Sequence, residues 1–341
     1  MRTEGLLAWY AREKRDLPWR RDRDPYRIWI SETMLQQTRV EAVRPRYEAF
    51  LAALPDVRAL AAVPEEALLK LWEGLGYYAR ARNLRRAAQE IVARGGFPRT
   101  AAALRTLPGF GPYTAGAVAS IAFGERAAAV DGNVLRVWAR LDAVAEDVRS
   151  PSARRACEAA VLAAMPPDAD PGAYNQALME LGALICTPRG PKCASCPVAS
   201  GCCAREEGLE AVLPVRAPAP ARAVEAFDVY LILEEGRALV RRRPARGLLA
   251  GLWEFPHGEE IARLAQPVRE GPPARHVFTH RIWEMRGVYA RLLPGAREEI
   301  AGREDWAWAD AAALRALPMA SAMERYRQDV LKNGGLTRWT T

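Results

Sequence analysis

The sequence predicts two domains, an all-α domain over residues 1–210 and a smaller α+β domain over residues 225–341. In the first part, apolar residues recur at helical spacing, and proline or glycine separates one helical stretch from the next. The segment 211–224, AVLPVRAPAPARAV, is typical of a semi-extended linker because it is rich in proline and alanine. After the linker, short runs such as 227–233, FDVYLIL, favour strands.

Each predicted element follows from a local pattern. Apolar residues at helical spacing run from Leu35 to Leu54 and again from Leu68 to Trp72, and the alanine-rich stretches also favour helix. In the second part, strands are predicted over 227–233, 238–242, 276–278 and 283–291, with a turn at 235–236 and a closing helix over 319–331.

The composition places the chain among globular proteins. Half of its 341 residues are hydrophobic and 26% are charged, which excludes a largely disordered or fibrous chain. Because no apolar run reaches the roughly 18 residues of a membrane span, and the N-terminus lacks a signal peptide, we expect a cytoplasmic protein without membrane contact. The net charge of +8 allows nucleic-acid binding, but a solvated surface explains it equally well.

The cysteines indicate a metal site. Five of the six lie within residues 186–203, whereas a disulfide framework would spread them over a small secreted domain. The spacings of six, two and five residues separate Cys186, Cys193, Cys196 and Cys202. Thiolates bind zinc or an iron–sulfur cluster, but zinc ribbons usually pair two short knuckles across a long spacer. Cys203, next to Cys202, is a competing ligand.

A glycine turn at residues 107–116, LPGFGPYTAG, joins two predicted helices. Gly109 and Gly111 permit a tight turn with free backbone N–H groups, and Pro112 opens the next helix where its missing N–H costs nothing. Such a turn can bind one phosphate, although glycine turns between helices are more often structural.

Two acidic residues form a candidate catalytic pair. Glu32 lies between apolar residues in WISETMLQQT, so it can face a cavity and stay protonated as a general acid. Asp131, in AVDGNV, precedes a helix whose start would keep it ionised, although a simple helix cap is the commonest use of such an Asp. Cleavage of an N-glycosidic bond needs both an acid for the leaving base and a negative charge near the cationic sugar.

Five motifs in order resemble adenine DNA glycosylases of the MutY type, in the endonuclease III and helix-hairpin-helix superfamily. They are SETMLQQT at 31–38, LPGFGPYTAG at 107–116, VDGNV at 130–134, NQALMELG at 175–182 and the cysteine loop at 186–202. The resemblance implies a helix-hairpin-helix glycosylase domain whose loop holds a 4Fe–4S cluster through Cys186, Cys193, Cys196 and Cys202. It also allows a monovalent cation at the hairpin.

The resemblance implies that the chain excises adenine mispaired with 8-oxoguanine or guanine in double-stranded DNA. Glu32 would protonate adenine, Asp131 would stabilise the cationic sugar, and Asn133 would position Asp131 or water. Related lyases carry a lysine where this sequence has Tyr113, and an imine cannot form on tyrosine. We therefore expect a monofunctional glycosylase that uses water as the final nucleophile and leaves an abasic site.

The flipped adenine needs a pocket, and side chains must fill the space that it leaves in the duplex. The family pattern assigns these DNA-binding roles to Trp19, Arg20, Leu35, Gln36, Gln37, Thr38, Leu75, Tyr77, Gly109, Gly111 and Gln176. Within this set, Leu75 and Tyr77 resemble a wedge that inserts into the base stack. Without the family pattern, Trp19 and Leu35 would be read as core residues.

The C-terminal part resembles the MutT-like (Nudix-fold) domain of the same family. Residues 247–256, GLLAGLWEFP, match the stretch that leads into a Nudix box, but the paired glutamates of the box are missing. We therefore expect recognition of the lesion without pyrophosphohydrolase activity. Phe278, Thr279 and His280 match the family's Phe-Ser-His, which contacts 8-oxoguanine, with threonine in place of serine.

Two other functions compete with adenine excision. An endonuclease III-like lyase acting on oxidised pyrimidines is disfavoured by Tyr113 and by the QQT segment at 36–38. A catalytically silent DNA-lesion binder is disfavoured because Glu32 and Asp131 are both present. We expect a monomer associated with the nucleoid.

Overall fold

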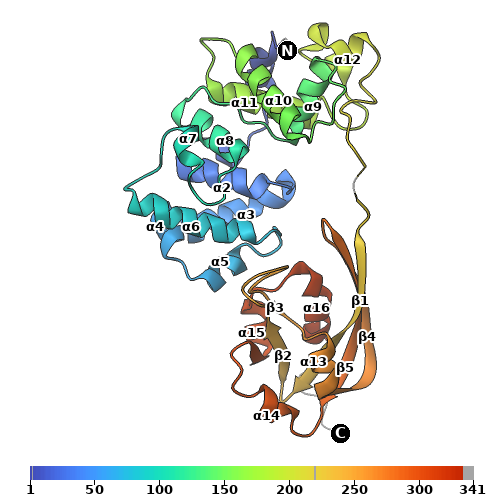
Figure 1. The fold of residues 1–341 in the computed structure, drawn as a ribbon. Coiled ribbons are helices and arrows are strands. Elements are labelled where there is room, and N and C mark those ends of the chain that lie inside the picture. Colours follow the sequence, from blue (N-terminus) through green and yellow to red (C-terminus); the bar gives the residue numbers. More distant parts are fainter. Residues whose placement is uncertain (2, 219, 333–341) are drawn as a thin grey trace. The chain divides into compact units, whose positions relative to one another are not determined.

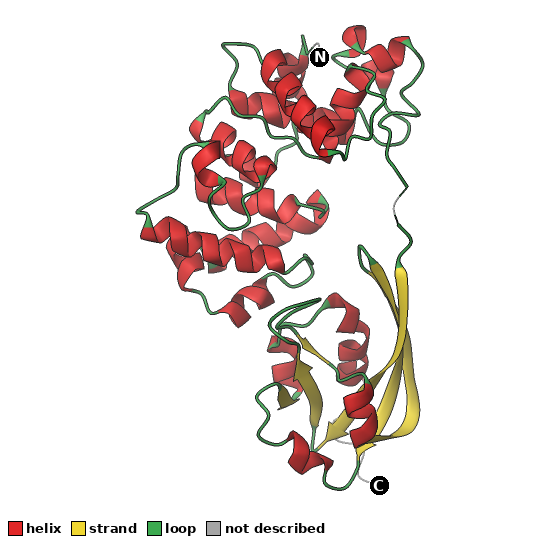
Figure 2. Cartoon of the chain, viewed as in Figure 1, coloured by secondary structure: helices red, strands yellow, loops and turns green. Residues whose placement is uncertain are grey.

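The computed structural model describes residues 1, 3–218 and 220–332, and its contacts divide the chain into two units. The first unit comprises Met1–Ala62 and Asn83–Pro218, and the second comprises Val63–Arg82 and Ala219–Thr341. Helices build the first unit, whereas the second contains both a sheet and helices (Figures 1 and 2). In the described part of the chain, no helix has the length and apolar character needed to cross a membrane.

The helices of the first unit follow the predicted pattern of short, punctuated segments. They are α1 (Leu6–Glu13), η1 (Pro18–Arg20), α2 (Pro25–Leu35), α3 (Val40–Ala53), α4 (Val57–Ala62), α6 (Ala79–Ala93), α7 (Ala101–Leu104), α8 (Pro112–Phe123), α9 (Gly132–Leu141), α10 (Pro151–Ala164), α11 (Pro171–Leu184), η2 (Cys193–Ser195), η3 (Ala199–Gly201) and α12 (Cys203–Glu206). Helix α6 begins in the second unit and continues into the first.

Small residues let the helices around the future site pack closely. Helix α8 is buried along most of its length, and a Cβ on Gly116 would lie 2.0 Å from the carbonyl oxygen of Ala128. A neighbouring core joins α1, α9, α10 and α11 through Trp9, Trp138 and Tyr174, among others. Because Gly116 has no side chain, the loop that leads into α9 can lie directly against α8.

The second unit contains a mixed sheet with the strand order β3-β2-β1-β5-β4, and β6 also pairs with β2. Strand β1 pairs with β5 in parallel, while the other pairs are antiparallel. The described elements of this unit are α5 (Glu65–Leu71), β1 (Ala223–Glu234), β2 (Arg237–Arg242), β3 (Trp253–Glu254), α13 (Glu259–Leu264), β4 (Ala265–Val277), β5 (Arg281–Leu292), α14 (Ala296–Ile300), β6 (Trp306–Ala309), α15 (Ala311–Ala316), η4 (Ser321–Met323) and α16 (Glu324–Lys332). The predicted fold class, a helical domain followed by an α+β domain, is confirmed.

Strand β4 was predicted only at its end, over 276–278. Its sequence contains Pro267, Pro272 and Pro273, which argue against a central strand because proline cannot donate to a ladder. The structure places β4 at the edge of the sheet, with register shifts at 267/269 and 270/273. An edge strand with bulges tolerates proline. The sequence pattern therefore does not predict most of β4, because it does not show that the strand lies at the edge of the sheet.

The first part of the segment predicted as a linker packs against the helices of the first unit. The Nε of Arg140 donates to the carbonyl oxygen of Leu213 at 3.0 Å, and the N–H of Ala217 donates to Oδ2 of Asp147 at 3.0 Å. The side chain of Leu213 is buried. The part of the predicted linker up to residue 217 is therefore fixed by contacts with the helical unit.

Residues 63–82 group with the C-terminal unit, although the sequence analysis placed them inside the helical part. Helix α5 has the apolar spacing of an ordinary amphipathic helix, so its local pattern does not reveal which partner it packs against. Only the tertiary contacts identify the C-terminal unit as that partner.

Candidate active site

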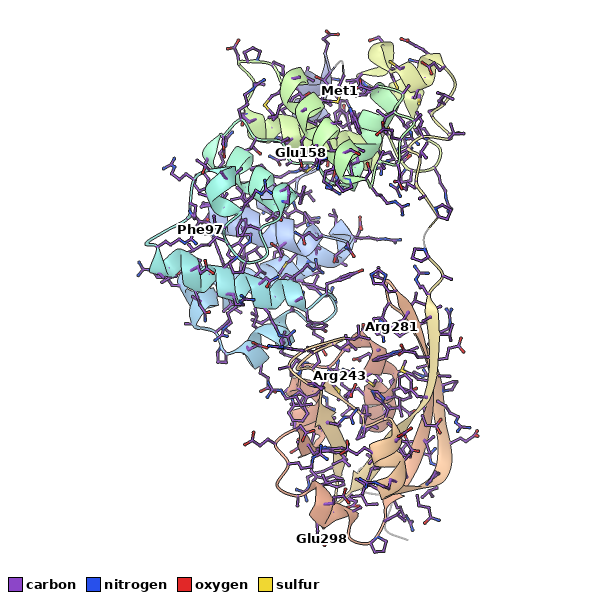
Figure 3. All side chains as sticks on the ribbon, viewed as in Figure 1. Met1, Phe97, Glu158, Arg243, Arg281 and Glu298 are labelled. Atoms are coloured by element: carbon purple, nitrogen blue, oxygen red, sulfur yellow. The ribbon has the colours of Figure 1, made fainter. Side chains whose placement is uncertain are left out.

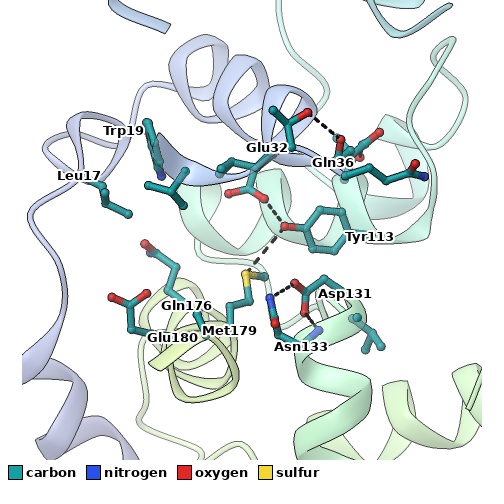
Figure 4. A pocket seen from close by; sticks show the side chains of 18 of the residues that line it. Leu17, Trp19, Glu32, Gln36, Tyr113, Asp131, Asn133, Gln176, Met179 and Glu180 are labelled. Carbon is teal, nitrogen blue, oxygen red and sulfur yellow. Dashed lines mark hydrogen bonds between the residues drawn. The ribbon is translucent and has the colours of Figure 1, made fainter. Parts of the chain in front are cut away.

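Helix α2 carries Glu32 into the interior of the first unit. The helix begins at Pro25, and Asp24 caps it by accepting hydrogen bonds from the N–H groups of Tyr26 and Arg27 at 2.8 and 3.4 Å. Glu32 is only 6% exposed. Its Oε2 accepts a hydrogen bond from the hydroxyl of Tyr113 (Figure 4).

Burial raises the pKa of Glu32 to about 7, although the hydrogen bond from Tyr113 lowers it and the negative charge of Asp131 raises it further. A carboxyl group with such a pKa is partly protonated at neutral pH and can give its proton to a bound base. The pKa of Tyr113 is raised by burial and by the two nearby carboxylates, so its hydroxyl stays a donor.

Asp131 caps α9, as its position in the sequence predicts. Its Oδ1 accepts hydrogen bonds from the N–H groups of Asn133 and Val134 at 2.9 and 2.8 Å, and its Oδ2 accepts one from Nδ2 of Asn133 at 2.8 Å. Burial nevertheless raises the pKa of Asp131, against these donors, so the helix start alone does not decide its ionisation. Because three N–H groups stabilise its carboxylate and one hydroxyl stabilises that of Glu32, Glu32 is the group that holds the proton.

Both carboxyl groups line one cavity of about 730 Å³ (Figure 4). Such a volume lies in the range of ligand pockets in proteins. Thirteen of the predicted site residues line the cavity: Trp19, Arg20, Glu32, Leu35, Gln36, Gln37, Thr38, Gly109, Gly111, Tyr113, Asp131, Asn133 and Gln176. The structure thus brings the catalytic, hairpin and pocket candidates of the first unit together.

One wall of the cavity carries a buried ionic group that the sequence analysis missed. Oε1 and Oε2 of Glu180 accept hydrogen bonds from the guanidinium of Arg15 at 2.9 and 2.7 Å, and from that of Arg20 at 3.1 and 2.9 Å. Burial alone would raise the pKa of Glu180, but these hydrogen bonds outweigh it and hold the pKa at about 2. The motif NQALMELG contains the clue, because Gln176 and Glu180 are four residues apart and share one face of α11.

The hairpin between α7 and α8 also lines the cavity. Gly109 has a φ of +78°, and a Cβ there would lie 2.7 Å from the Cβ of Asn83, so this position requires glycine. The N–H groups of Phe110 and Gly111 donate within the turn, to the carbonyls of Leu107 and Gly109 at 3.2 Å. The prediction that the turn leaves its backbone N–H groups free is therefore wrong for Phe110 and Gly111.

A hydrogen-bonded chain connects Asp131 to the cysteine loop through Arg136. Its Nη2 donates to Oδ1 of Asn133 at 2.7 Å, and its Nε donates to the carbonyl oxygen of Cys186 at 2.8 Å. Asn133 in turn donates to Asp131. Arg136 is almost completely buried, so the amide of Asn133 is held in one orientation.

Helix α11 contacts this chain through Gly182. The carbonyl of Gly182 accepts a hydrogen bond from Nη2 of Arg136 at 2.8 Å, and a Cβ at this position would lie 2.6 Å from the Cβ of Asn133. A close approach of two helices is possible here only because the residue has no side chain.

We expect the substitution Gly182→Ala to displace Asn133 and so weaken its hold on Asp131. Overpacking of this kind costs roughly 1–3 kcal/mol of stability. Thermal unfolding should show a lower midpoint, and the base-release rate of the folded variant should also fall. An unchanged midpoint together with an unchanged rate would show that the contact between α11 and α9 has room for a methyl group.

The four predicted ligand cysteines surround a second, smaller cavity. Cys186, Cys193, Cys196 and Cys202 all line this space of about 20 Å³, together with Arg140. Nη1 of Arg140 lies 3.3 Å from the Sγ of Cys186. Among the described residues, no group of three or more His, Cys, Asp or Glu side chains is packed closely enough to hold a single metal ion as it stands.

Burial raises the pKa of the Cys196 thiol to about 11, and the charges of the three other thiols raise it further. The thiol of Cys196 therefore stays protonated on its own, and the four cysteines can act together as thiolate ligands only when a bound cation or cluster stabilises their charge. Cys203 begins α12 and does not line the cavity. The residues present fit a group held by the other four thiolates.

The remaining predicted DNA contacts, Leu75, Tyr77 and Phe278–His280, lie in the second unit. Leu75 is buried, whereas Tyr77 is 49% exposed, and its hydroxyl is 2.7 Å from Oγ1 of Thr279. Phe278 packs against Trp283 at a ring-centroid distance of 4.8 Å. Arg281, which is labelled in Figure 3, starts β5 directly after His280.

Comparisons with known proteins agree with this architecture. The family model described as "HhH-GPD superfamily base excision DNA repair protein" matches residues 30–161, and the model described as "NUDIX domain" matches residues 228–329. The adenine DNA glycosylase of Mycolicibacterium smegmatis is 42% identical over 209 residues, covering 60% of this chain and 70% of that protein.

The adenine DNA glycosylase of Homo sapiens is 40% identical over 339 residues, covering 80% of this chain and 62% of that protein. The chain spans about half to three-fifths of the length of the animal and plant relatives that it matches. A solved structure of a thermostable thymine-DNA glycosylase is 30% identical, with a TM-score of 0.53, and covers 60% of this chain and 95% of that one.

Proposed function

The chain belongs to the adenine DNA glycosylase family, and from that premise we propose that it excises adenine mispaired with 8-oxoguanine or guanine in double-stranded DNA. The observation that carries the proposal is the shared cavity, which Glu32 enters from α2 and Asp131 from the start of α9. A proton on Glu32 and a negative charge on Asp131 are the two features that hydrolysis of an N-glycosidic bond requires.

In the proposed reaction, the adenine nucleotide is flipped out of the duplex into the cavity. Glu32 protonates the base, which makes it a better leaving group, and Asp131 stabilises the positive charge that develops on the sugar. The bond between the sugar and the base breaks, water bonds to the same sugar carbon, and the proton that the water loses returns to Glu32, which leaves an abasic site. Asn133 and Arg136 hold Asp131 in place, and Tyr113 positions the carboxyl group of Glu32.

The wall opposite the acids offers groups that suit the edge of adenine. The amide of Gln176 can pair with an adenine acceptor and donor together. Trp19 supplies an apolar surface at the same cavity. These contacts would favour adenine over bases with a different pattern of donors and acceptors.

The function is tested by single-turnover excision on duplexes that carry adenine opposite 8-oxoguanine, guanine, cytosine or thymine. We expect base release from the first two and much slower release from the last two. A protein that releases adenine from neither the 8-oxoguanine nor the guanine mispair would contradict the proposal.

We further propose that the enzyme is monofunctional. The described residues that line the cavity include no lysine, so no amine is present there to form an imine with the sugar. Treatment with borohydride during the reaction should therefore trap no covalent protein–DNA adduct. A trapped adduct would favour an endonuclease III-like lyase.

Cys186, Cys193, Cys196 and Cys202 would hold a 4Fe–4S cluster, which members of this superfamily usually carry. Bound there, the cluster would fix the loop 186–202, which has little core of its own. Through Arg136, that loop also supports Asn133. A monomer acting on the nucleoid in the cytoplasm completes the proposal.

The substitution Cys202→Ser is expected to abolish the visible absorbance of the purified protein and its bound iron. The matched control is Cys203→Ser, which changes the adjacent residue outside the small cavity and should leave both properties intact. Iron and acid-labile sulfide analysis with the absorbance spectrum measures the result. Zinc in a colourless wild-type protein, or loss of the cluster in Cys203→Ser alone, would refute the assignment.

A further inference from the structure

Polar contacts anchor α5 and the chain after it to the C-terminal part of the second unit. The Nε1 of Trp253 donates to Oε1 of Glu66 at 2.9 Å. The guanidinium of Arg82 donates to the carbonyl oxygen of Ala250 and also to Oε1 of Glu65, the latter at 2.7 Å. These groups hold both ends of the segment 63–82 against the strands and helices that follow the linker.

Arg327 provides the central ion pair of this contact. Its Nη1 donates to Oε1 of Glu73 at 2.8 Å, and Nζ of Lys70 donates to Oε2 of the same carboxylate at 2.6 Å. The side chain of Arg327 is only 12% exposed. Because the pair is shielded from solvent, it can fix the end of α5 more firmly than a surface ion pair does.

The turn that follows α5 presents Tyr77 in a strained conformation. Tyr77 has a φ of +48°, which residues other than glycine rarely adopt. The nearby Gly74 and Gly76 have φ values of +84° and +68°. Arg80 donates to the carbonyls of Leu75 and Gly76 at 2.8 and 3.1 Å. Such strain persists only where surrounding contacts impose it.

The ring of Tyr77 is nevertheless accessible. The guanidinium carbon of Arg80 lies 5.5 Å from the centre of the ring, and the Tyr77 hydroxyl contacts Thr279 in the loop before β5. An exposed aromatic ring on a rigid turn can stack on a nucleic-acid base. Tyr77 and Thr279 thus form one exposed surface of the second unit.

We propose that Arg327 is a positioning residue that, through Glu73 and the turn after α5, holds Tyr77 where it stacks on a base beside the mispair. This inference rests on the proposed function. It gives the part of the chain that follows residue 218 a role in placing Tyr77, which lies more than 140 residues earlier in the sequence. The C-terminal unit then acts on DNA through Tyr77 as well as through its own loop.

A double-mutant cycle tests the proposal in the full-length protein. Arg327→Met is made in the wild type and in a Tyr77→Ala background, with Arg327→Lys as the conservative variant and Arg325→Met as a control from the exposed face of α16. The measured quantities are the single-turnover excision rate opposite 8-oxoguanine and the fluorescence of 2-aminopurine placed beside the 8-oxoguanine. Thermal unfolding midpoints establish that each variant is folded.

We expect Arg327→Met to slow excision roughly tenfold and to reduce the fluorescence change on binding, since Arg327 pairs with Glu73, four residues before Tyr77. Arg327→Lys should restore most of both, and Arg325→Met should change neither. In the Tyr77→Ala background, Arg327→Met should have no additional effect. Equal effects in both backgrounds, or no effect in the wild type, would overturn the proposal.

The same measurements distinguish failure of the proposed function from failure of the positioning role of Arg327. If the wild type releases no adenine, the proposed function fails, while the 2-aminopurine fluorescence still reports whether Arg327 controls the stacking of Tyr77. If the wild type excises adenine but the cycle is additive, only the positioning role of Arg327 is refuted.

Discussion

Glu32→Gln is expected to lower the single-turnover excision rate by roughly 10²–10⁴-fold, the usual contribution of a positioned general acid. Glutamine has nearly the same shape and can still accept the hydrogen bond from Tyr113, so the cavity should persist. It has no proton to give to the leaving base. Binding to the mispair, measured separately, should change little.

Glu48→Gln is the matched control, because Glu48 is exposed on α3 and does not line the cavity. Its excision rate should equal that of the wild type. An unchanged rate in Glu32→Gln would mean that another group, or water, protonates the base.

The pH dependence gives an independent check on the same residue. Glu32 acts in its protonated form and its pKa is raised to about 7, so the rate should fall as pH rises through that value. Asp131 acts in its ionised form and its pKa is also raised, so the rate should fall again at low pH. The two apparent values belong to the coupled pair. In Glu32→Gln the decline above pH 7 should disappear.

Short motifs located the two acids because local structure places each of them. Asp131 is the cap of α9, and a cap is defined by the residues that directly follow it. Glu32 lies in an apolar stretch of a helix, so the residues beside it in the sequence indicate that it is buried. Their convergence on one cavity depends on helix packing, which short motifs do not show.

The missed residues of the site act across large sequence distances. Arg15 and Glu180 are separated by 165 residues, and Arg136 reaches Cys186 across 50. Each looks like an ordinary charged residue of a helix or loop when only its neighbours are considered. Their roles follow from tertiary contacts, as does the grouping of residues 63–82 with the C-terminal unit.

Asp131→Asn is expected to slow excision by roughly 10²–10³-fold, in the range found for loss of one electrostatic stabiliser. The new side chain keeps an oxygen that can accept from the N–H groups of Asn133 and Val134, so α9 remains capped. It carries no negative charge to oppose the cation on the sugar.

The hydrogen bonds around Asp131 make this substitution more severe than the loss of charge alone. In Asp131→Asn, the amide nitrogen would face Nδ2 of Asn133, and two donors would meet. Asn133 cannot turn over to relieve this, because Arg136 donates to its Oδ1 and fixes its orientation. A modest loss of stability should therefore accompany the loss of activity.

Asp310→Asn is a suitable control for that experiment, because Asp310 also caps a helix by accepting from a backbone N–H, that of Ala313 at 2.8 Å, but lies in the second unit. It should leave the excision rate unchanged. In Asp131→Asn the fall in rate at low pH should also vanish, because the group that titrates there has been removed. An excision rate close to that of the wild type, in a folded variant, would show that the developing sugar cation is stabilised by something other than this carboxylate.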